Sequence, residues 1–407
     1  MEKRDFDVLI IGSGPAGTAC AMSLGNSGLS VAILDKAAFP RDKICGDALS
    51  VDVLNQLPLL QTDLAARFQE LNSKLSSYGV RIFAPDHQYI DLPFLYKGEA
   101  ACGYLCPRFE FDQLMVEQLN GLENVTRFEE CVVERLERTD KEILAHTNIG
   151  VFTAKLIAGA DGAQSVVARQ LASFKPDREH YSAGLRVYYE GITSFQESKF
   201  IELHFFKDVL PGYLWIFPLP NNRANVGIGV LSSVVSRKKM NLKTVLHGLI
   251  ENNPHLHKRF RDAKPLEVAK GYGLPLGSKK RKISGDKFLL LGDAASLIDP
   301  FTGEGIGNAI RSGRVAANHI IEAFRMNDFS SSFNRAYDQE IYRRMWPELK
   351  VSRALQKLCR YPKLFNSVIR KANKSQYIHD LLIDALAHSK KKKSLLQPSF
   401  YYHLLFK

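Results

Sequence analysis

Short apolar blocks alternate with longer amphipathic segments along the first part of the chain. DVLII at residues 7–11 predicts a buried strand, and the segment opened by GSGPAG predicts a helix that runs to about Asn26. VAILD at residues 31–35 predicts a second buried strand. A strand, a helix and a strand in this order predict a βαβ unit at the N-terminus.

The rest of the chain predicts further strands, then a sheet, then helices. PRFEFDQLMVEQL, from Pro107, has apolar residues at helical spacing. The later elements are two strands near 130–146 and 151–159, a sheet over about 180–232, a helical stretch near 240–262, a buried strand in KFLLLGDAAS with a helix after it, and helices from about 330 onward. The pattern therefore predicts an α/β chain with a block of sheet in its middle.

Composition places the chain among soluble globular proteins, because 45% of its 407 residues are hydrophobic and 24% are charged. We find no run of about 18 apolar residues and no signal peptide, so we expect no transmembrane helix. The six cysteines, at positions 20, 45, 102, 106, 131 and 359, form no CxxC pair. We therefore expect reduced thiols in a cytoplasm, with no metal site and no disulfide framework.

The positive charge is concentrated at the C-terminal end. Residues 343–407 hold 15 Lys/Arg against three acids, an excess that equals the net charge of +12 of the whole chain. This segment includes the lysine run 390–393 and ends in aromatic and aliphatic residues. Such a tail suits the surface of an anionic bilayer, although a solvated lysine patch is the simpler alternative. No nucleic-acid recognition module is visible, so we expect no nucleic-acid partner.

The GSGPAG turn has the GxGxxG spacing of a dinucleotide site, with Gly12, Gly14 and Gly17. The first glycine permits the tight turn, the second lets a pyrophosphate approach the backbone, and the third lets the helix pack on the strand. Asp35 ends the second strand, where an acid can accept hydrogen bonds from a ribose diol. These features predict bound FAD or NAD.

A second strand-turn-helix, LLLGDAASLIDPFTGEGIGNAI, favours FAD over NAD. It carries Asp293 but no second GxGxxG unit, and an acid at a strand end can bind the ribityl chain of a flavin. Together with AGADGAQS at Asp161 and with Arg108, the four pieces resemble the glutathione-reductase-type flavoproteins. They are most similar to the branch of aromatic hydroxylases, flavin halogenases and geranylgeranyl reductases.

The resemblance implies a set of cofactor-binding residues drawn from all four pieces. They are Gly12, Gly14, Ala16, Gly17, Asp35, Lys36, Arg41, Cys45, Gly46, Arg108, Asp161, Gly162, Asp293, Pro300, Gly303, Gly305, Ile306 and Gly307.

Two further motifs resemble the geranylgeranyl reductase family within this branch. FPRDKICGDAL resembles its PxxxxCG loop, although this chain has Asp47 where the family often has a second glycine. GYLWIFPLPNNRANVGIGV resembles its YxWxFP…GxG signature. A halogenase is expected to carry WxWxIP, and Tyr213 and Phe217 depart from that pattern.

The resemblance implies reduction of carbon–carbon double bonds in an isoprenoid (geranylgeranyl-type) lipid. An isolated alkene needs early protonation, and aromatic faces stabilise the positive charge that results. We therefore expect Tyr213, Trp215 and Cys45 to be catalytic. Cys45 is a pocket-lining or proton-relay thiol, a structural residue or a nucleophile, and His204 is a second candidate acid.

The expected fold class is α/β: a glutathione-reductase-type Rossmann FAD domain with an inserted antiparallel β-sheet substrate domain and a C-terminal helical segment. The FAD domain takes residues 1–75, 101–172 and 271–335, the substrate domain 76–100 and 173–270, and the basic segment 336–407.

We expect an FAD-dependent oxidoreductase that receives electrons from NAD(P)H or ferredoxin and contacts the inner face of a membrane peripherally. A monooxygenase or halogenase on the same scaffold is the alternative enzyme, and a flavin-binding carrier without turnover is the alternative of another class.

Overall fold

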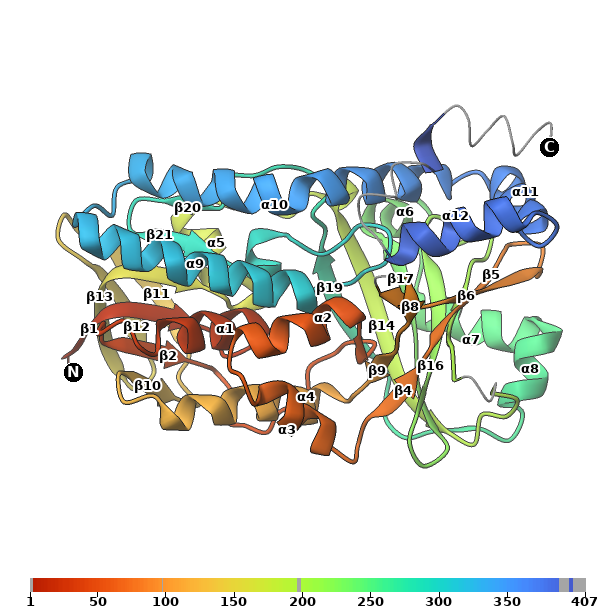
Figure 1. The fold of residues 1–407 in the computed structure, drawn as a ribbon, viewed down its shortest axis with the longest axis horizontal. Helices are drawn as coiled ribbons and strands as arrows, with labels where there is room; N and C mark the ends of the chain where they lie inside the picture. The colour runs from red at the N-terminus through yellow and green to blue at the C-terminus, as the bar shows by residue number, and fades with distance from the viewer. Residues whose placement is uncertain (1–2, 97, 196–198, 388–394, 398–407) are drawn as a thin grey trace.

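The first half of the fold is an eight-stranded sheet with a parallel centre (Figure 1). The computed structural model describes residues 3–96, 98–195, 199–387 and 395–397. In strand β1 (Lys3–Ile11) the last four residues are buried, as are all four of β2 (Val31–Leu34), which explains their continuous apolar runs. The sheet is completed by β10 (Val125–Phe128), β11 (Val133–Arg138), β12 (Ile143–Thr147), β13 (Gly150–Gly159), β20 (Ser284–Gly285) and β21 (Phe288–Leu290).

Helices pack against this sheet. Helix α1 (Pro15–Leu24) is buried along almost its whole length, because α9 (Ile306–Met326) packs on it. The other helices of this half are α2 (Val51–Gln56), α3 (Leu64–Glu70), α4 (Arg108–Glu117) and α5 (Val166–Leu171). The arrangement places the carboxyl ends of β1, β2 and β13 at the edge that faces the second half of the molecule (Figure 1).

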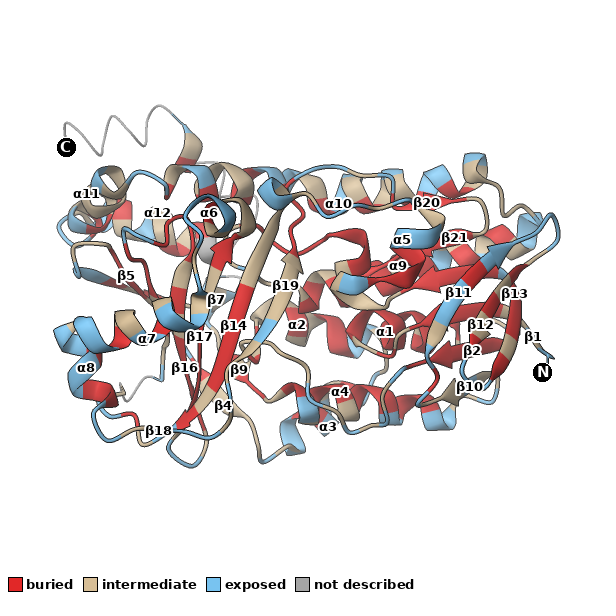
Figure 2. Ribbon diagram, turned by 180° about the vertical axis from the view of Figure 1, so that it is seen from behind, coloured by how far each residue is buried: buried red, intermediate tan, exposed pale blue. Residues whose placement is uncertain are grey.

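The second half is built on another eight-stranded sheet, which is mostly antiparallel. Its strands are β5 (Gly79–Phe83), β6 (Tyr89–Pro93), β14 (Tyr181–Glu190), β15 (Ile201–His204), β16 (Tyr213–Leu219), β17 (Arg223–Leu231), β18 (Lys264–Pro265) and β19 (Lys270–Pro275). One face packs on α7 (Leu242–Asn252) and α8 (Pro254–Phe260) through residues such as Ile216 and Val226, and α6 (Ser232–Arg237) lies beside β14. The opposite face looks toward the first half (Figure 2).

Short strands and a helical end complete the chain. Strands β3 (Ala48–Leu49), β4 (Leu75–Ser77) and β9 (Gly103–Leu105) form a small sheet, and β7 (Leu95–Tyr96) pairs with β8 (Glu99–Ala100). Helix α10 (Ser331–Leu358) runs along one side of the molecule, followed by α11 (Pro362–Ala372) and α12 (Gln376–Ala387) (Figure 1). The lysine run 390–393 lies outside the described residues.

The fold class agrees with the sequence prediction, and one local prediction is wrong. The strand expected near 130–146 is a hairpin of β11 and β12, closed where the Thr139 amide donates to the Glu142 carbonyl at 2.9 Å. The helical stretch expected near 240–262 is confirmed. It consists of two helices, because the Asn253 side chain accepts from the amides of His255 and Leu256 and starts a new helix at Pro254.

Three of the predicted domain boundaries fall inside strands or helices. The predicted boundary after residue 270 cuts β19, whose residues pair with β14 up to Pro275. The boundary after residue 75 cuts β4, and the one after residue 335 cuts α10. We propose the same division into an FAD unit and a sheet unit, with these three boundaries moved to the ends of the elements.

Candidate functional site

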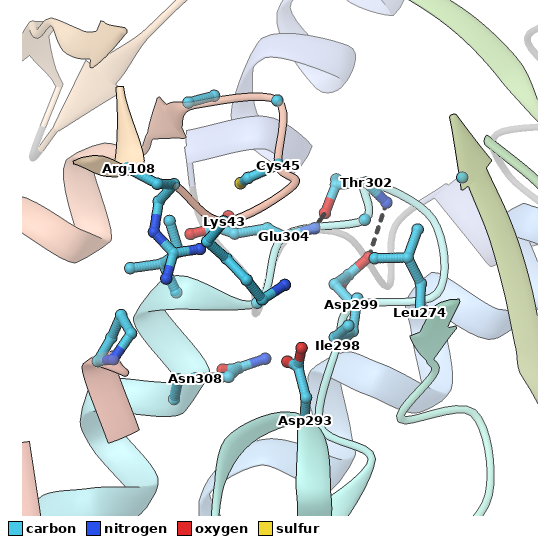
Figure 3. Close-up of a pocket in the computed structure, with 18 of the residues that line it drawn as sticks. Lys43, Cys45, Arg108, Leu274, Asp293, Ile298, Asp299, Thr302, Glu304 and Asn308 are labelled. Carbon is cyan, nitrogen blue, oxygen red and sulfur yellow. Dashed lines mark hydrogen bonds between the residues drawn. The ribbon is translucent and has the colours of Figure 1, made fainter. Parts of the chain in front are cut away.

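A cavity of about 1010 Å³ lies between the two halves of the molecule (Figure 3). Ligands of open α/β sheets bind at the carboxyl ends of the strands, and this cavity begins there. Most of the predicted residues line it, from both halves: Gly12, Gly14, Ala16, Asp35, Lys36, Arg41, Cys45, Gly46, Arg108, Asp161, Gly162, Tyr213, Trp215, Asp293, Pro300, Gly303, Gly305 and Ile306. Gly17 and Gly307 lie outside its lining.

The three glycines of the first turn have different surroundings. A Cβ on Gly12, whose φ is +99°, would lie 2.6 Å from the Ala160 carbonyl oxygen. A Cβ on Gly17 would lie 1.9 Å from the Gly12 carbonyl oxygen, so α1 and β1 touch there. A Cβ on Gly14 would meet only Arg41 Nη2, at 3.8 Å, and would stand in the cavity. The turn therefore keeps open space at the N-terminus of α1, where a phosphate is favoured.

Asp35 is buried and holds the glycine turn in place. One carboxylate oxygen accepts from the Ser13 amide at 2.7 Å, and the other accepts from the Ala37 amide at 3.0 Å. Arg41 lies beside this carboxylate, at 4.0 Å, and bonds Asp112 at 3.1 Å. The contact of Asp35 with a ribose stays a prediction, while its structural contacts already fix the shape of the cavity.

Asp161 has one carboxylate oxygen in use and one unpartnered. Its Oδ2 accepts from the Val166 amide at 2.6 Å and from the Val167 amide at 3.3 Å. Its buried Oδ1 has no hydrogen-bond partner among the described residues. Burial raises the pKa of this carboxyl. A ligand hydroxyl or amide in the cavity would satisfy the free oxygen.

The turn after Asp293 closes another side of the cavity (Figure 3). The Asp299 carboxylate accepts from the amides of Phe301 and Thr302, at 2.8 and 2.9 Å. Gln356, in α10, donates to the Pro300 carbonyl at 2.6 Å. The backbone of this turn is therefore fixed from inside and from α10.

Cys45 lies in the cavity beside two cations (Figure 3). Arg108 forms a bidentate pair with Asp112, with both N···O distances 2.7 Å, and it lines the same cavity as Cys45. The Lys43 ammonium lies 3.4 Å from the centre of the Tyr272 ring. Burial lowers the pKa of Lys43 to about 8, although Asp293 opposes the shift.

Asp47 and Asn225 join the Cys45 loop to the second sheet. The fully buried Asp47 has φ +65°, and its Oδ2 accepts from the Tyr188 hydroxyl at 2.6 Å and from Asn225 Nδ2 at 2.8 Å. The same Nδ2 donates to the Cys45 carbonyl at 2.7 Å. Burial raises the pKa of Asp47 to about 6, even though these hydrogen bonds oppose it. In the sequence, Asp47 stands out only as a departure from a family motif, and no sequence signal identifies Asn225.

Three aromatic residues of β16 face the cavity because they alternate along the strand. Tyr213, Trp215 and Phe217 all line it. The Trp215 indole donates to Asn225 Oδ1 at 2.9 Å, and the Tyr213 hydroxyl donates to the Thr302 carbonyl. Burial raises the pKa of Tyr213. The aromatic wall is thus tied to both the Cys45 loop and the turn after Asp293.

The GxG on β17 explains how the indole lies flat on the sheet. Trp215 pairs with Gly227 across the strands, and a Cβ on Gly227 would lie 2.1 Å from Trp215 Cζ2 and 2.3 Å from the Leu185 carbonyl oxygen. A Cβ on Gly229 would lie 3.7 Å from the indole, an ordinary contact. The aromatic motif and the first glycine of the GxG are therefore one packing unit.

Gly227→Ala is expected to displace the indole and to lower the free energy of unfolding by about 1–3 kcal/mol, as overpacking usually does. Thermal melting and tryptophan fluorescence would measure the two effects. Gly229→Ala is the matched control, since its methyl group fits. Equal melting temperatures for the two variants would contradict the packing unit.

His204 lies on the other face of the sheet. It pairs across the strands with Leu214, is buried, and stacks on Phe83 at 4.1 Å between ring centres. Its Nε2 lies 3.0 Å from Glu202, which also bonds Arg259 at 2.6 Å. His204 is absent from the cavity lining, so the structure does not place it where it could protonate a substrate.

The cavity fits FAD on three observations. Gly14 leaves space at the N-terminus of α1 for a phosphate. The buried Asp161 Oδ1 has no hydrogen-bond donor among the described residues, and a hydroxyl or amide of the cofactor could supply one. The volume of about 1010 Å³ is at the upper end of the ~300–1,000 Å³ of small-molecule sites, which suits a dinucleotide with a second ligand beside it.

Comparison with known proteins gives the same result. A family model described as "FAD binding domain" matches residues 5–346. Menaquinone reductase of Mycolicibacterium smegmatis is 30% identical over 342 residues, covering 80% of this chain and 79% of the relative. Digeranylgeranylglycerophospholipid reductase of Methanosarcina acetivorans is 29% identical over 362 residues, covering 85% and 81%.

Solved structures share the fold. A geranylgeranyl bacteriochlorophyll reductase-like protein from Thermoplasma acidophilum superposes with a TM-score of 0.80 at 23% identity, over 97% of this chain and 99% of the other. A halogenase in complex with FAD superposes with a TM-score of 0.73 at 18% identity, over 96% and 85%. The chain is therefore an enzyme of the FAD-binding domain family, a FAD-dependent oxidoreductase of the branch that includes the geranylgeranyl reductases.

Proposed function

We propose that the protein reduces carbon–carbon double bonds in an isoprenoid lipid, with FAD as the hydride carrier. The observation that carries this proposal is the aromatic wall of Tyr213, Trp215 and Phe217, which shares one cavity with the predicted flavin-binding residues. Two relatives named as reductases of a digeranylgeranyl lipid and of menaquinone support the substrate class.

FAD, when bound, would supply the hydride, and the chain's own residues would do the rest. The glycine turn, Asp35, Asp161 and Asp293 would hold the cofactor. The aromatic wall would stabilise positive charge that develops on the alkene carbon, because ring faces attract cations. We propose that Cys45, whose carbonyl is held by Asn225, lines the reacting end of the cavity and relays the proton.

An anaerobic turnover experiment tests the proposal. The flavin of the purified protein is reduced, a geranylgeranyl-bearing lipid is added, and product mass is recorded together with flavin reoxidation. The expected result is a stepwise gain of two hydrogens coupled to reoxidation. Unchanged lipid with a flavin that stays reduced would contradict the substrate class.

Trp215→Ala is expected to slow this reoxidation at least about tenfold, equivalent to about 1.4 kcal/mol of transition-state stabilisation. The chain offers a matched control in its second tryptophan, Trp346, which packs against Tyr342 in α10 and does not line the cavity. Trp346→Ala should therefore keep the wild-type rate. Cys45→Ala tests the relay in the same assay.

Repeating the assay with oxygen and halide separates the alternative enzyme, because a monooxygenase or halogenase adds an atom to the product. The similarity between this chain and the solved halogenase is a similarity of fold and does not indicate halogenation. The proposed electron donor is NAD(P)H or a ferredoxin, and the rate of anaerobic flavin bleaching with each would identify it.

We also propose peripheral contact with an anionic membrane from the cytoplasmic side. Within the described part of the chain, no helix is both long enough and apolar enough to cross a bilayer. Around α11 and α12, the exposed Tyr361 and Tyr377 accompany the exposed cations Lys363 and Arg370, a combination that suits a lipid surface. Cosedimentation with anionic but not neutral vesicles is expected, and equal recovery with both would contradict the proposal.

A further inference from the structure

A second, smaller cavity of about 110 Å³ lies where the C-terminal helices pack on the edge of the second sheet. Ile82 and Leu92 line it from strands β5 and β6. Leu358 lines it from α10, Val368 from α11 and Ala385 from α12. We call this cavity the C-terminal chamber. All of its lining residues are apolar apart from Thr302, so it offers water almost no hydrogen-bond partners.

One turn separates the chamber from the large cavity. Phe301 and Thr302 line both spaces. The Tyr213 hydroxyl holds the Thr302 carbonyl from the side of the large cavity, and Gln356 of α10 holds the Pro300 carbonyl at 2.6 Å. The two spaces therefore share the Phe301–Thr302 turn as a common wall.

Aromatic rings also lead from the large cavity to the chamber. The Tyr213 ring centre lies 5.4 Å from that of Phe205, and the Phe205 ring centre lies 4.8 Å from that of Phe365. Phe365 lines the chamber, and Tyr213 lines the large cavity. Aromatic side chains thus line the region between the two spaces. Such a region suits a hydrocarbon and not a charged group.

The size of the chamber limits what it can take. A protein cavity of ~150 Å³ lined by Leu, Ile and Phe stays dry and binds molecules the size of benzene. The chamber, at about 110 Å³, is somewhat smaller and suits one branched hydrocarbon end. A lipid headgroup or a nucleotide would find no polar partners there.

We propose that the C-terminal chamber binds the far end of the substrate's linear prenyl chain and so sets the longest chain that the enzyme accepts. This inference rests on the proposed function, because it takes the substrate to carry such a chain. A chain that lies along the aromatic wall would pass the Phe301–Thr302 turn and place its last isoprene unit among the side chains of α10, α11 and α12. The C-terminal helices, most of which lie beyond the matched residues 5–346, would then determine chain-length selectivity.

The test measures the binding of prenyl alcohols, because binding can be measured whether or not the protein carries out the proposed reaction. The oxidised FAD-bound protein is titrated with geraniol, farnesol and geranylgeraniol, and the dissociation constants are obtained from the rise in melting temperature. Ala385→Leu puts a larger side chain into the chamber. Ala372→Leu is the matched control, since Ala372 is equally buried in the same apolar cluster but does not line the chamber.

We expect Ala385→Leu to weaken the binding of geranylgeraniol about tenfold and to leave the affinity for geraniol unchanged. Ala372→Leu should not change the ratio of these two affinities. Equal effects on all three alcohols, or no effect, would show that the chamber is only a packing void and would overturn the inference. Val368→Phe fills the chamber from α11 and replaces Ala385→Leu if that variant does not fold.

The two proposals can fail separately. If Ala385→Leu weakens geranylgeraniol selectively but the wild-type protein reduces no prenyl lipid in the anaerobic assay, the chamber stands and the proposed reaction fails. If it reduces prenyl lipids and Ala385→Leu leaves their length preference unchanged, the chamber fails and the reaction stands. Absence of binding by any of the alcohols overturns the chamber.

Discussion

Gly14→Ala is expected to give a protein that folds like the wild type and binds FAD at least about tenfold more weakly, a loss of about 1.4 kcal/mol. Gly14 has φ −72° and ψ −179°, which alanine adopts readily, and its added Cβ would meet only Arg41 at 3.8 Å. The methyl group would instead occupy the space at the N-terminus of α1, where we expect the pyrophosphate. FAD titration of the apoprotein and its melting temperature measure the two effects separately.

Gly17→Ala is the informative companion to this variant. Its Cβ would lie 1.9 Å from the Gly12 carbonyl oxygen, which is backbone and cannot rotate away. This variant is therefore expected to lose stability as well as FAD. If Gly14→Ala binds FAD with wild-type affinity, the pyrophosphate does not approach the turn at this residue.

Asn225→Leu is expected to lower the free energy of unfolding by at least about 3 kcal/mol. It leaves several buried polar groups without a hydrogen-bond partner, at a cost of about 1–3 kcal/mol each. The amide of Asn225 bonds the Cys45 carbonyl, the Asp47 carboxylate and the Trp215 indole, at 2.7, 2.8 and 2.9 Å. Turnover should fall as well, since the Cys45 loop and Trp215 lose their shared anchor. Denaturant unfolding and the anaerobic assay measure these losses.

Asn252→Leu provides the control, since Asn252 is exposed on α7 and bonds only its own helix, at the Gly248 carbonyl. It should unfold like the wild type. Wild-type stability of Asn225→Leu would show that the amide does not hold the loop and the sheet together.

Asn225→Asp makes the same network sensitive to pH. The new carboxyl would face Asp47, whose pKa burial already raises to about 6 from an ordinary 3.8. Because two adjoining carboxylates resist joint ionisation, the folded protein keeps a proton that the unfolded chain releases near its ordinary pKa. Measured against the wild type at each pH by denaturant unfolding, the stability contributed by this pair should therefore be greatest below the ordinary carboxyl pKa of 3.8 and be lost as the pH rises through about 6 and above.

The glycine turn at residues 12–17 could be predicted from sequence, because the residues that form it are close together in the chain. Gly12, Gly14 and Gly17 stand within one strand-turn-helix, and Asp35 ends the next strand, so spacing alone identifies them. The cavity-facing side of β16 could likewise be predicted, because Tyr213, Trp215 and Phe217 occupy alternate positions along one strand.

The network around Asp47 could not be predicted, because its members are distant in sequence. Asp47 is 178 residues from Asn225 and 141 from Tyr188. Their contact depends on how the second sheet docks against the Cys45 loop. The placement of His204 depended on the register between β15 and β16, which pairs it with the buried Leu214 and turns it away from the cavity. Alternation along a strand divides its residues between two faces. Only the pairing with the neighbouring strand decides which of these faces lines the cavity.

The order of strands in the first sheet has a consequence for how the protein is made. Strand β1 pairs with β13, where Val8 meets Leu156, and β13 pairs with β21, where Ile157 meets Phe288. Helix α1 packs on α9, which ends at Met326. During synthesis, β1 can pair early with β2, but its other edge must wait for β13 and the face of α1 must wait for α9, so apolar surface stays uncovered meanwhile. We expect FAD to bind only after α9 has left the ribosome.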